Sequence, residues 1–277
     1  MNSEHLQTRT GFASEQGKRE SNDDFVVMQE AEVNTRGVGE AVAAIADGIS
    51  GPGGRLAAET VARGFLDGYL SQPPTLGVGQ AALKSLTAMN RWVYSQGRQD
   101  QKLRNMATTF SALFLRGRVA HVVHVGDTRI YRLRAGRLQC LTQDHTHSHP
   151  DMQHVLHRAV GLEEIVRADY ATHDLQAHDR YLLCSDGVHA TLDGARLHAL
   201  LAERSAPEEA ARRIVDEALS ARSQDNATAL VLDALAVPAA ERRSGDAGGR
   251  HAHFGIAEAG RRGGWFSAFG NGVRWPL

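Results

Sequence analysis

The chain has 277 residues, of which 42% are hydrophobic, and this is enough to bury one substantial core in a single domain. The formal net charge is −1 and the pI is near 6.9, so no overall field favours nucleic acid or an anionic membrane surface as a partner. No stretch reaches the roughly 18 apolar residues of a membrane span, and the N-terminus has no apolar leader region. We therefore expect a cytoplasmic monomer that binds neither nucleic acid nor membranes.

The N-terminal part, residues 5–30, alternates short strand-like pieces with one polar turn. That turn, GKRESNDDF at residues 17–25, places Arg19 near Asp23 and Asp24. An arginine near two carboxylates is typical of a solvated turn and equally of a charged site. This motif alone leaves both interpretations open.

Residues 41–58 carry the strongest local signal in the chain. The apolar run AVAAIA ends at Asp47 and Gly48 and is followed by a glycine-rich segment. We predict a buried strand that ends at Asp47, a turn at Gly48 with an unobstructed carbonyl, and a helix that begins near Arg55. Carboxylate and carbonyl oxygens presented together favour a hard cation, although Asp-Gly is also an ordinary turn sequence.

Two helical patterns follow, with apolar residues at three- and four-residue spacing over residues 55–70 and again over about 78–96. The Pro73-Pro74 pair separates them. We predict that both apolar stripes pack on the core. The second stripe consists of Leu83, Leu86, Met89, Trp92 and Val93.

Residues 107–141 read as strands joined by glycine-containing turns. Apolar side chains fall on both faces of the segment TTFSALFL, with Phe110 and Phe114 on one face and Leu113 and Leu115 on the other. A strand covered on one face by a second sheet and on the other by helices would show this pattern. We therefore predict an α+β fold with two packed sheets flanked by helices, in four layers.

Acidic residues recur where apolar strand patterns end. Asp127 interrupts the strands at a predicted turn or bulge, Asp186 follows the apolar run YLLCS, and Asp225 with Asn226 precedes a closing strand. Acid beside Gly or Asn at several strand boundaries indicates that these side chains converge. The surrounding patterns predict strands at residues 166–174 and 181–185 and helices at 193–204 and 207–221.

Neither the cysteines nor the histidines indicate a zinc site. Cys140 and Cys184 lie in apolar, strand-like surroundings without CxxC spacing, which predicts reduced, buried thiols. Residues 144–157 hold five histidines, but their spacing matches neither HExxH nor a Cys/His finger, and Pro150 marks an irregular loop.

Beyond Val237 the sequence is rich in Ala, Gly and Arg and shows no periodic pattern. We predict one domain over residues 1–237 and a disordered Gly/Arg-rich tail over 238–277.

Taken in order, these motifs resemble those of the type 2C metal-dependent serine/threonine phosphatases, the PPM family. The similarity covers roughly residues 5–235. The matching positions are Arg19 with Asn22-Asp23-Asp24, Asp47 to Gly51, Thr108-Thr109, Gly126-Asp127-Thr128-Arg129, Asp144-His145-Thr146, Ser185-Asp186-Gly187 and Asp225-Asn226. The wording of several stretches is most similar to bacterial members fused to a protein kinase, although no kinase motif is present here.

The resemblance implies two antiparallel sheets around a centre that holds two Mn²⁺ or Mg²⁺ ions, which are hard cations suited to oxygen ligands. It implies that Asp47, Asp186 and Asp225 hold the first ion. The second is implied to bind Asp24, Asp47 and the Gly48 carbonyl, with Asp23 acting through water. The family's third ion uses Asp127, Asp186 and a further aspartate, but that last position is Ala190 here, so third-ion binding is expected to be weak.

The implied activity is hydrolysis of phosphoserine and phosphothreonine in proteins by a metal-bridging water, with Arg19 binding the phosphate and Asp47 shared by both ions. Phosphorylated proteins, together with a serine/threonine kinase and its targets, are the implied partners in signal transduction. Ile49 stands where some members have a histidine proposed as general acid. The alternative is a non-catalytic phosphoprotein-binding pseudophosphatase module.

Overall fold

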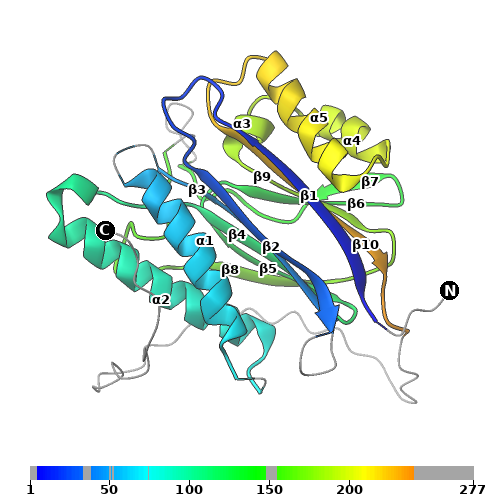
Figure 1. Ribbon diagram of the computed structural model, residues 1–277, viewed down its shortest axis with the longest axis horizontal. Helices are drawn as coiled ribbons and strands as arrows, with labels where there is room; N and C mark the ends of the chain where they lie inside the picture. The colour runs from blue at the N-terminus through cyan, green and yellow to red at the C-terminus, as the bar shows by residue number, and fades with distance from the viewer. Residues whose placement is uncertain are drawn as a thin grey trace. The chain divides into compact units, whose positions relative to one another are not determined.

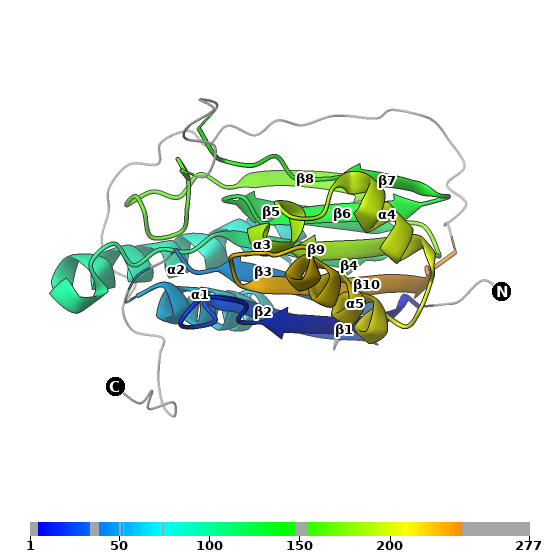
Figure 2. The same cartoon turned by 90° about the horizontal axis from the view of Figure 1, so that it is seen from above.

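The computed structural model describes residues 5–33, 39–49, 51, 53–73, 75–147 and 155–239. Two five-stranded antiparallel sheets pack face to face, and helices cover both outer faces (Figure 1, Figure 2). The predicted four-layer α+β fold is therefore confirmed. The chain divides into two units, Met1–Ala240 and Glu241–Leu277. The predicted tail lies almost entirely outside the described residues.

The first sheet has the strand order β1-β10-β9-β6-β7 and the second has the order β2-β3-β4-β5-β8. The strands of the first sheet are β1 (Gln7–Glu15), β10 (Ala227–Ala236), β9 (Arg180–Cys184), β6 (Arg129–Arg134) and β7 (Arg137–Cys140). Those of the second sheet are β2 (Asp24–Val33), β3 (Gly39–Asp47), β4 (Phe110–Arg116), β5 (Val119–Val125) and β8 (Asp169–Asp174). The chain passes from one sheet to the other four times: between β1 and β2, between β5 and β6, between β7 and β8, and between β8 and β9.

Strand β4 shows why the layers form. Phe110 and Phe114 belong to the cluster between the second sheet and its helices, whereas Leu113 and Leu115 belong to the cluster between the two sheets. All four side chains are fully buried. Alternating side chains on a strand point to opposite faces, so a strand that is apolar on both faces needs cover on both.

Helices α1 (Gly54–Leu70) and α2 (Val78–Gln99) cover the second sheet, and a single 3-10 turn, η1 (Gln101–Leu103), follows them. Helices α3 (Asp186–His189), α4 (Gly194–Ala202) and α5 (Pro207–Ser220) cover the first sheet. The predicted helices agree with these within a few residues. Pro207 begins α5, where its missing N–H breaks no intrahelical hydrogen bond. Every helix in the described part of the chain is too short or too polar to cross a bilayer.

Two expectations were wrong in detail, and one helix was not predicted. Trp92 is 41% exposed, and the polar side chain of Asn90 is fully buried on α2 instead. Cys140 is exposed because β7 is a short edge strand, whereas Cys184 is buried on the central strand β9; both thiols are free. The residues after β9 form the helix α3, for which the sequence patterns predicted no element.

Candidate metal centre

The strand ends bring five aspartates to one edge of the two sheets. Asp24 begins β2 and Asp47 ends β3, and the two lie directly opposite each other in the antiparallel ladder. Each of the other three lies at a strand end or in the turn between two strands, and each repels at least one of the remaining four. These are Asp127 between β5 and β6, Asp186 after β9 and Asp225 before β10. The predicted convergence of the strand-end acids therefore occurs in the structure.

Asp24 is buried with half of its carboxylate left without a partner. The Ser185 hydroxyl donates to Asp24 Oδ2 over 2.8 Å. The other oxygen, Oδ1, is buried and accepts no hydrogen bond. Burial raises the pKa of Asp24 to about 7, and repulsion from Asp186 and Asp225 adds to the shift.

Asp47 is held through its backbone by the two threonines of the Thr-Thr motif. Its N–H donates to Thr109 Oγ1 over 2.9 Å, and its carbonyl accepts from Thr109 N at 2.9 Å and from Thr108 Oγ1 at 2.8 Å. Burial raises the pKa of the Asp47 carboxyl well above its ordinary value, and repulsion from Asp24, then Asp186, adds to the shift. The Asp47 carboxylate therefore lies close to several other carboxylates, at a strand end that is held by backbone hydrogen bonds.

Asp186 and Asp225 lie on the first-sheet side of the centre, together with Arg19. Burial raises the pKa of Asp186, with repulsion from Asp225 as the next cause, and its carboxyl group lies within hydrogen-bonding reach of Asp47. Asp186 Oδ1 is also buried without a partner. Arg19 Nη2 donates to Asp225 Oδ2 over 2.5 Å. The predicted phosphate-binding guanidinium therefore lies at the acidic centre.

The loop that carries Arg19 and Asp23 is fastened by one amide side chain. Asn226 Nδ2 donates to the carbonyls of Gln16 and Ser21, each over 2.8 Å, and Asn226 Oδ1 accepts from Asp23 N at 2.9 Å. The Asp23 carbonyl accepts from Gly48 N at 3.1 Å, and its carboxylate accepts from the Ser21 hydroxyl. Asp23 is therefore tied to the centre by its backbone, and its carboxylate is already hydrogen-bonded within its own loop.

The turn that carries Asp127 is held from three sides. His189 Nε2 donates to the Asp127 carbonyl over 2.9 Å, because a carbonyl oxygen can only accept. Burial lowers the pKa of His189 to about 4, so the ring is neutral. Gly126 N donates to His145 Nδ1 over 3.1 Å. Arg129 donates from Nε and Nη2 to Asp144 over 2.9 and 2.7 Å. Burial raises the pKa of Asp127 itself to about 7.

The donor atoms at the centre determine which cations it can bind. The donors are carboxylate and carbonyl oxygens, which suit Mn²⁺ and Mg²⁺ rather than softer metals. Buried oxygens without partners, as on Asp24 and Asp186, and raised carboxyl pKa values are what a set of ligands shows when its positive charge is missing. Among the described residues, no group of three or more His, Cys, Asp or Glu side chains is placed to hold a metal ion by itself, so water would have to complete the coordination of any bound ion. The centre therefore fits hydrated hard cations.

Sequence reasoning missed the residues that support the ligands. Ser185 and Asn226 each stand next to a predicted ligand in the sequence, and the side chain of each binds at or just before the start of β2. The only indication of such a supporting role in the sequence was a polar residue next to a motif aspartate. Its target could not be known before β9, β10 and the first loop were brought together.

Comparisons with known proteins agree with this geometry. The sequence profile of the family described as protein phosphatase 2C matches residues 14–226. The serine/threonine protein phosphatase PstP of Mycobacterium tuberculosis is 31% identical over 218 residues, which cover 71% of this chain and 41% of PstP. The serine/threonine phosphatase Stp of Listeria welshimeri is 26% identical over 208 residues, covering 68% of this chain and 82% of that protein.

Solved structures show the same fold. The catalytic domain of PstP in complex with two manganese ions superposes with a TM-score of 0.71 and 26% identity, covering 82% of this chain and 98% of that one. PppA of Pseudomonas aeruginosa gives a TM-score of 0.69 and 27% identity over 82% of this chain and 98% of its own. This chain spans about two fifths of the length of the M. tuberculosis PstP that it matches. Because the family profile covers more than half of the chain, the chain belongs to the protein phosphatase 2C family.

Proposed function

We propose that this chain is a protein serine/threonine phosphatase that uses two Mn²⁺ or Mg²⁺ ions, with a weak third, to hydrolyse phosphoserine and phosphothreonine. The observation that carries the proposal is the acidic centre, in which buried oxygens of Asp24 and Asp186 lack partners. A phosphoprotein-binding module would have no need for such repulsion. A serine/threonine kinase must supply the substrates, since it makes the phosphate esters that this activity removes.

The ions would be held as the motifs suggest. Asp47, Asp186 and Asp225 would hold the first ion, and Asp24, Asp47 and the Gly48 carbonyl would hold the second. Asp127 with Asp186 would hold the third. When bound, the ions supply Lewis acidity that activates a water molecule and neutralises charge on the phosphate.

Arg19 is the group that meets the phosphate. Its guanidinium lies at the edge of the centre, paired with Asp225 and half-exposed, so a phosphate can approach it from solvent. A guanidinium offers parallel N–H donors that match two phosphate oxygens, and it stabilises charge that develops during displacement. Arg19 thus orients the ester and Asp225 orients Arg19.

Proton transfer to the leaving group does not come from residue 49. Ile49 carries no titratable group, and its N–H donates to the Ala107 carbonyl over 3.0 Å. The departing serine or threonine oxygen is therefore expected to take its proton from solvent. We therefore expect the pH–rate profile to show no ionisation of a general acid at position 49.

The test is hydrolysis of p-nitrophenyl phosphate and of a phosphothreonine peptide by the full chain. We expect activity with added Mn²⁺ that EDTA abolishes, because hydrated oxygen-ligand sites release their ions readily. Asp47→Asn should lower kcat by at least about 100-fold, whereas Asp216→Asn, which changes an exposed aspartate on α5, should not. Full activity after chelation, or equal activity of both variants, would exclude the proposed centre.

A further inference from the structure

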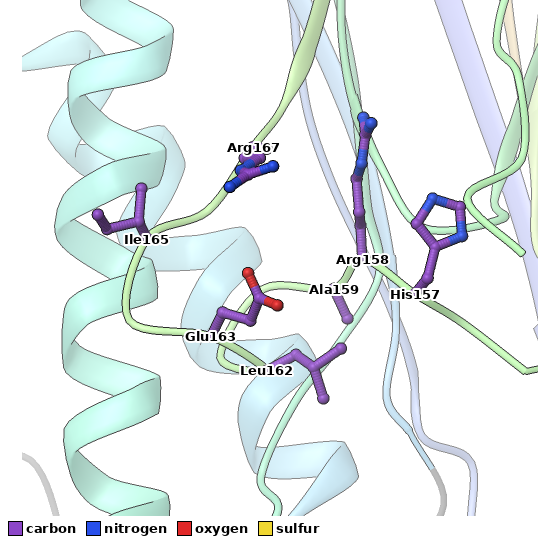
Figure 3. Close-up of a pocket in the computed structure, with 7 residues that line it drawn as sticks. All are labelled: His157, Arg158, Ala159, Leu162, Glu163, Ile165 and Arg167. Atoms are coloured by element: carbon purple, nitrogen blue, oxygen red, sulfur yellow. The ribbon is translucent and has the colours of Figure 1, made fainter. Parts of the chain in front are cut away.

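A pocket of about 180 Å³ lies in the loop that precedes β8. Its lining combines charged and apolar side chains, and two of the apolar ones, Leu162 and Ile165, are 44% and 73% exposed. Figure 3 shows the pocket with its lining: His157, Arg158, Ala159, Leu162, Glu163, Ile165 and Arg167. The proposed chemistry at the acidic centre uses none of these residues.

The loop is fixed to the fold, so the pocket exists before any ligand arrives. Asn90, fully buried on α2, donates from Nδ2 to the carbonyls of Glu163 and Glu164, each over 3.0 Å. Asn90 Oδ1 accepts from Gly161 N at 2.7 Å. A buried amide that satisfies three backbone groups of one loop restricts its conformations, and a preformed site binds at lower entropic cost.

The pocket borders the acidic centre. Thr108 bridges Val160 on one side and Gly48 on the other, so these three backbones lie side by side. Adjacent strands are separated by roughly 4.8 Å, so Val160 is about 10 Å from Gly48. An extended peptide advances about 3.3 Å per residue. A side chain two or three residues from a phosphorylated residue in the centre would therefore reach the pocket.

The charges of the lining are arranged asymmetrically. Arg158 and Arg167 lie on one side of the pocket, and Glu163 lies on the opposite side with Leu162 (Figure 3). Arg158 Nη1 donates to Asp169 over 3.1 Å, and Asp169 also accepts from His145. Arg167 is exposed and lines the pocket. A guanidinium has five N–H donors, so the arginine side of the pocket favours a carboxylate.

We propose that this pocket binds an acidic side chain of the phosphoprotein substrate, two or three residues from the phosphorylated serine or threonine. Arg167 donates to the carboxylate, and Leu162 and Ile165 contact the neighbouring apolar part of the peptide. The proposal rests on the phosphatase function proposed above. It assigns to the chain a preference for acidic sequences around the phosphorylated residue.

The experiment compares phosphothreonine peptides that carry an Asp-Glu pair two and three residues before or after the phosphorylated residue with peptides that carry Ala-Ala there. We measure kcat/KM with Mn²⁺ for the full chain, for Arg167→Gln and for Glu163→Gln. The wild type should prefer the acidic pair about 5- to 10-fold on one side. Arg167→Gln should remove that preference, and Glu163→Gln should increase it, because the two side chains act on the same carboxylate with opposite sign.

Arg137→Gln is the matched control, since Arg137 is exposed on β7 of the other sheet. Hydrolysis of p-nitrophenyl phosphate, which is too small to reach the pocket, should be unchanged in all variants. Equal hydrolysis of acidic and alanine peptides, or a shift of both pocket variants in the same direction, would overturn the proposal. If p-nitrophenyl phosphate is not hydrolysed at all, the phosphatase function fails instead. In that case, fluorescence anisotropy of the labelled peptides tests whether the pocket binds the acidic pair, because binding does not need turnover.

Discussion

Arg19 and Asp225 form an ion pair across the centre, with 2.5 Å between Nη2 and Oδ2. The two side chains are 45% and 32% exposed, so the pair lies at the open side of the acidic group rather than inside it. Exposed ion pairs contribute only about 0–1 kcal/mol to stability. The Arg19–Asp225 pair therefore matters for orientation more than for stability. Asp225 holds the guanidinium where we propose that the phosphate binds.

Substituting Arg19 should reduce catalysis far more than folding. We expect Arg19→Ala to lower kcat/KM for a phosphothreonine peptide by about 100-fold or more, as when a donor to developing charge is lost. Arg19→Lys should restore only part of it, since an ammonium group is a point charge without the paired N–H geometry. Steady-state kinetics check this, with Lys18→Ala as the neighbouring control. A loss of the same size in Lys18→Ala would contradict a specific role for Arg19.

In EDTA, which removes bound metal, the protein should lose stability as the pH rises. Burial raises the pKa values of Asp24 and Asp127 to about 7, above their ordinary value of 3.8. The folded state then binds more protons than the unfolded state, so the free energy of unfolding falls with increasing pH between roughly 4 and 7. We expect the melting temperature without metal to be lower at pH 8 than at pH 5.5 by on the order of 5 °C.

Two measurements make this pH effect specific. Asp47→Asn removes one of the repelling charges and should raise the melting temperature of the chelated protein at pH 8 while leaving pH 5.5 nearly unchanged. Saturating Mn²⁺ should stabilise the wild type at pH 8, because the ion binds the folded state. A melting temperature that rises with pH in EDTA would show that the carboxyl groups are not perturbed as described.

The acidic centre could be found from the sequence because its carboxylates stand at strand ends. An apolar run that stops at Asp47 or Asp186 marks both the strand and the carboxylate, and antiparallel pairing returns successive strand ends to one edge. Likewise the two apolar faces of β4 required cover on both sides. These properties are local, so one chain is enough to read them.

The remaining features depend on which segments meet. Trp92 has the correct helical spacing for a core residue, yet the helix turns Asn90 inward because the loop at residues 161–164 presents backbone groups that need partners. Cys140 is apolar in sequence context, but its strand became an edge. Asn226 could not be assigned to the Arg19 loop before β10 was placed beside β1. Periodicity reports burial on one element and says nothing of the partner.

Gly126 should tolerate no side chain. Its φ is +110°, and a Cβ there would lie 2.6 Å from Thr109 Cβ. We expect Gly126→Ala to destabilise the protein by about 3 kcal/mol through backbone strain and overlap. Thermal unfolding checks this, with Gly136→Ala as the control, since Gly136 also has a positive φ but has open space around its Cβ. If both variants lost the same stability, the contact with Thr109 would have no part in it.

Our last prediction concerns Ala190 and the Mn²⁺ concentration that activity requires. Ala190 is exposed at the C-terminal end of α3 and donates its N–H to the Asp186 carbonyl over 2.8 Å, so it lies one helical turn after Asp186. Ala190→Asp would add a carboxylate beside Asp186 and Asp127, and we expect the half-maximal Mn²⁺ concentration for activity to fall about 3- to 10-fold, because carboxylate count tunes affinity at such sites. Ala190→Asn, which is similar in size without the charge, is the control.

His189 provides the contrasting variant for that titration. Its Nε2 donates to the Asp127 carbonyl, so this nitrogen supports the turn that carries Asp127. His189→Ala should therefore raise the Mn²⁺ requirement by loosening Asp127, whereas Ala190→Asp lowers it. Titration of free Mn²⁺ by electron paramagnetic resonance measures the bound ion directly, independent of turnover. Identical Mn²⁺ binding by the wild type and both variants would mean that Asp127 holds no ion and that the ions bound by Asp24, Asp47, Asp186 and Asp225 alone set the metal requirement.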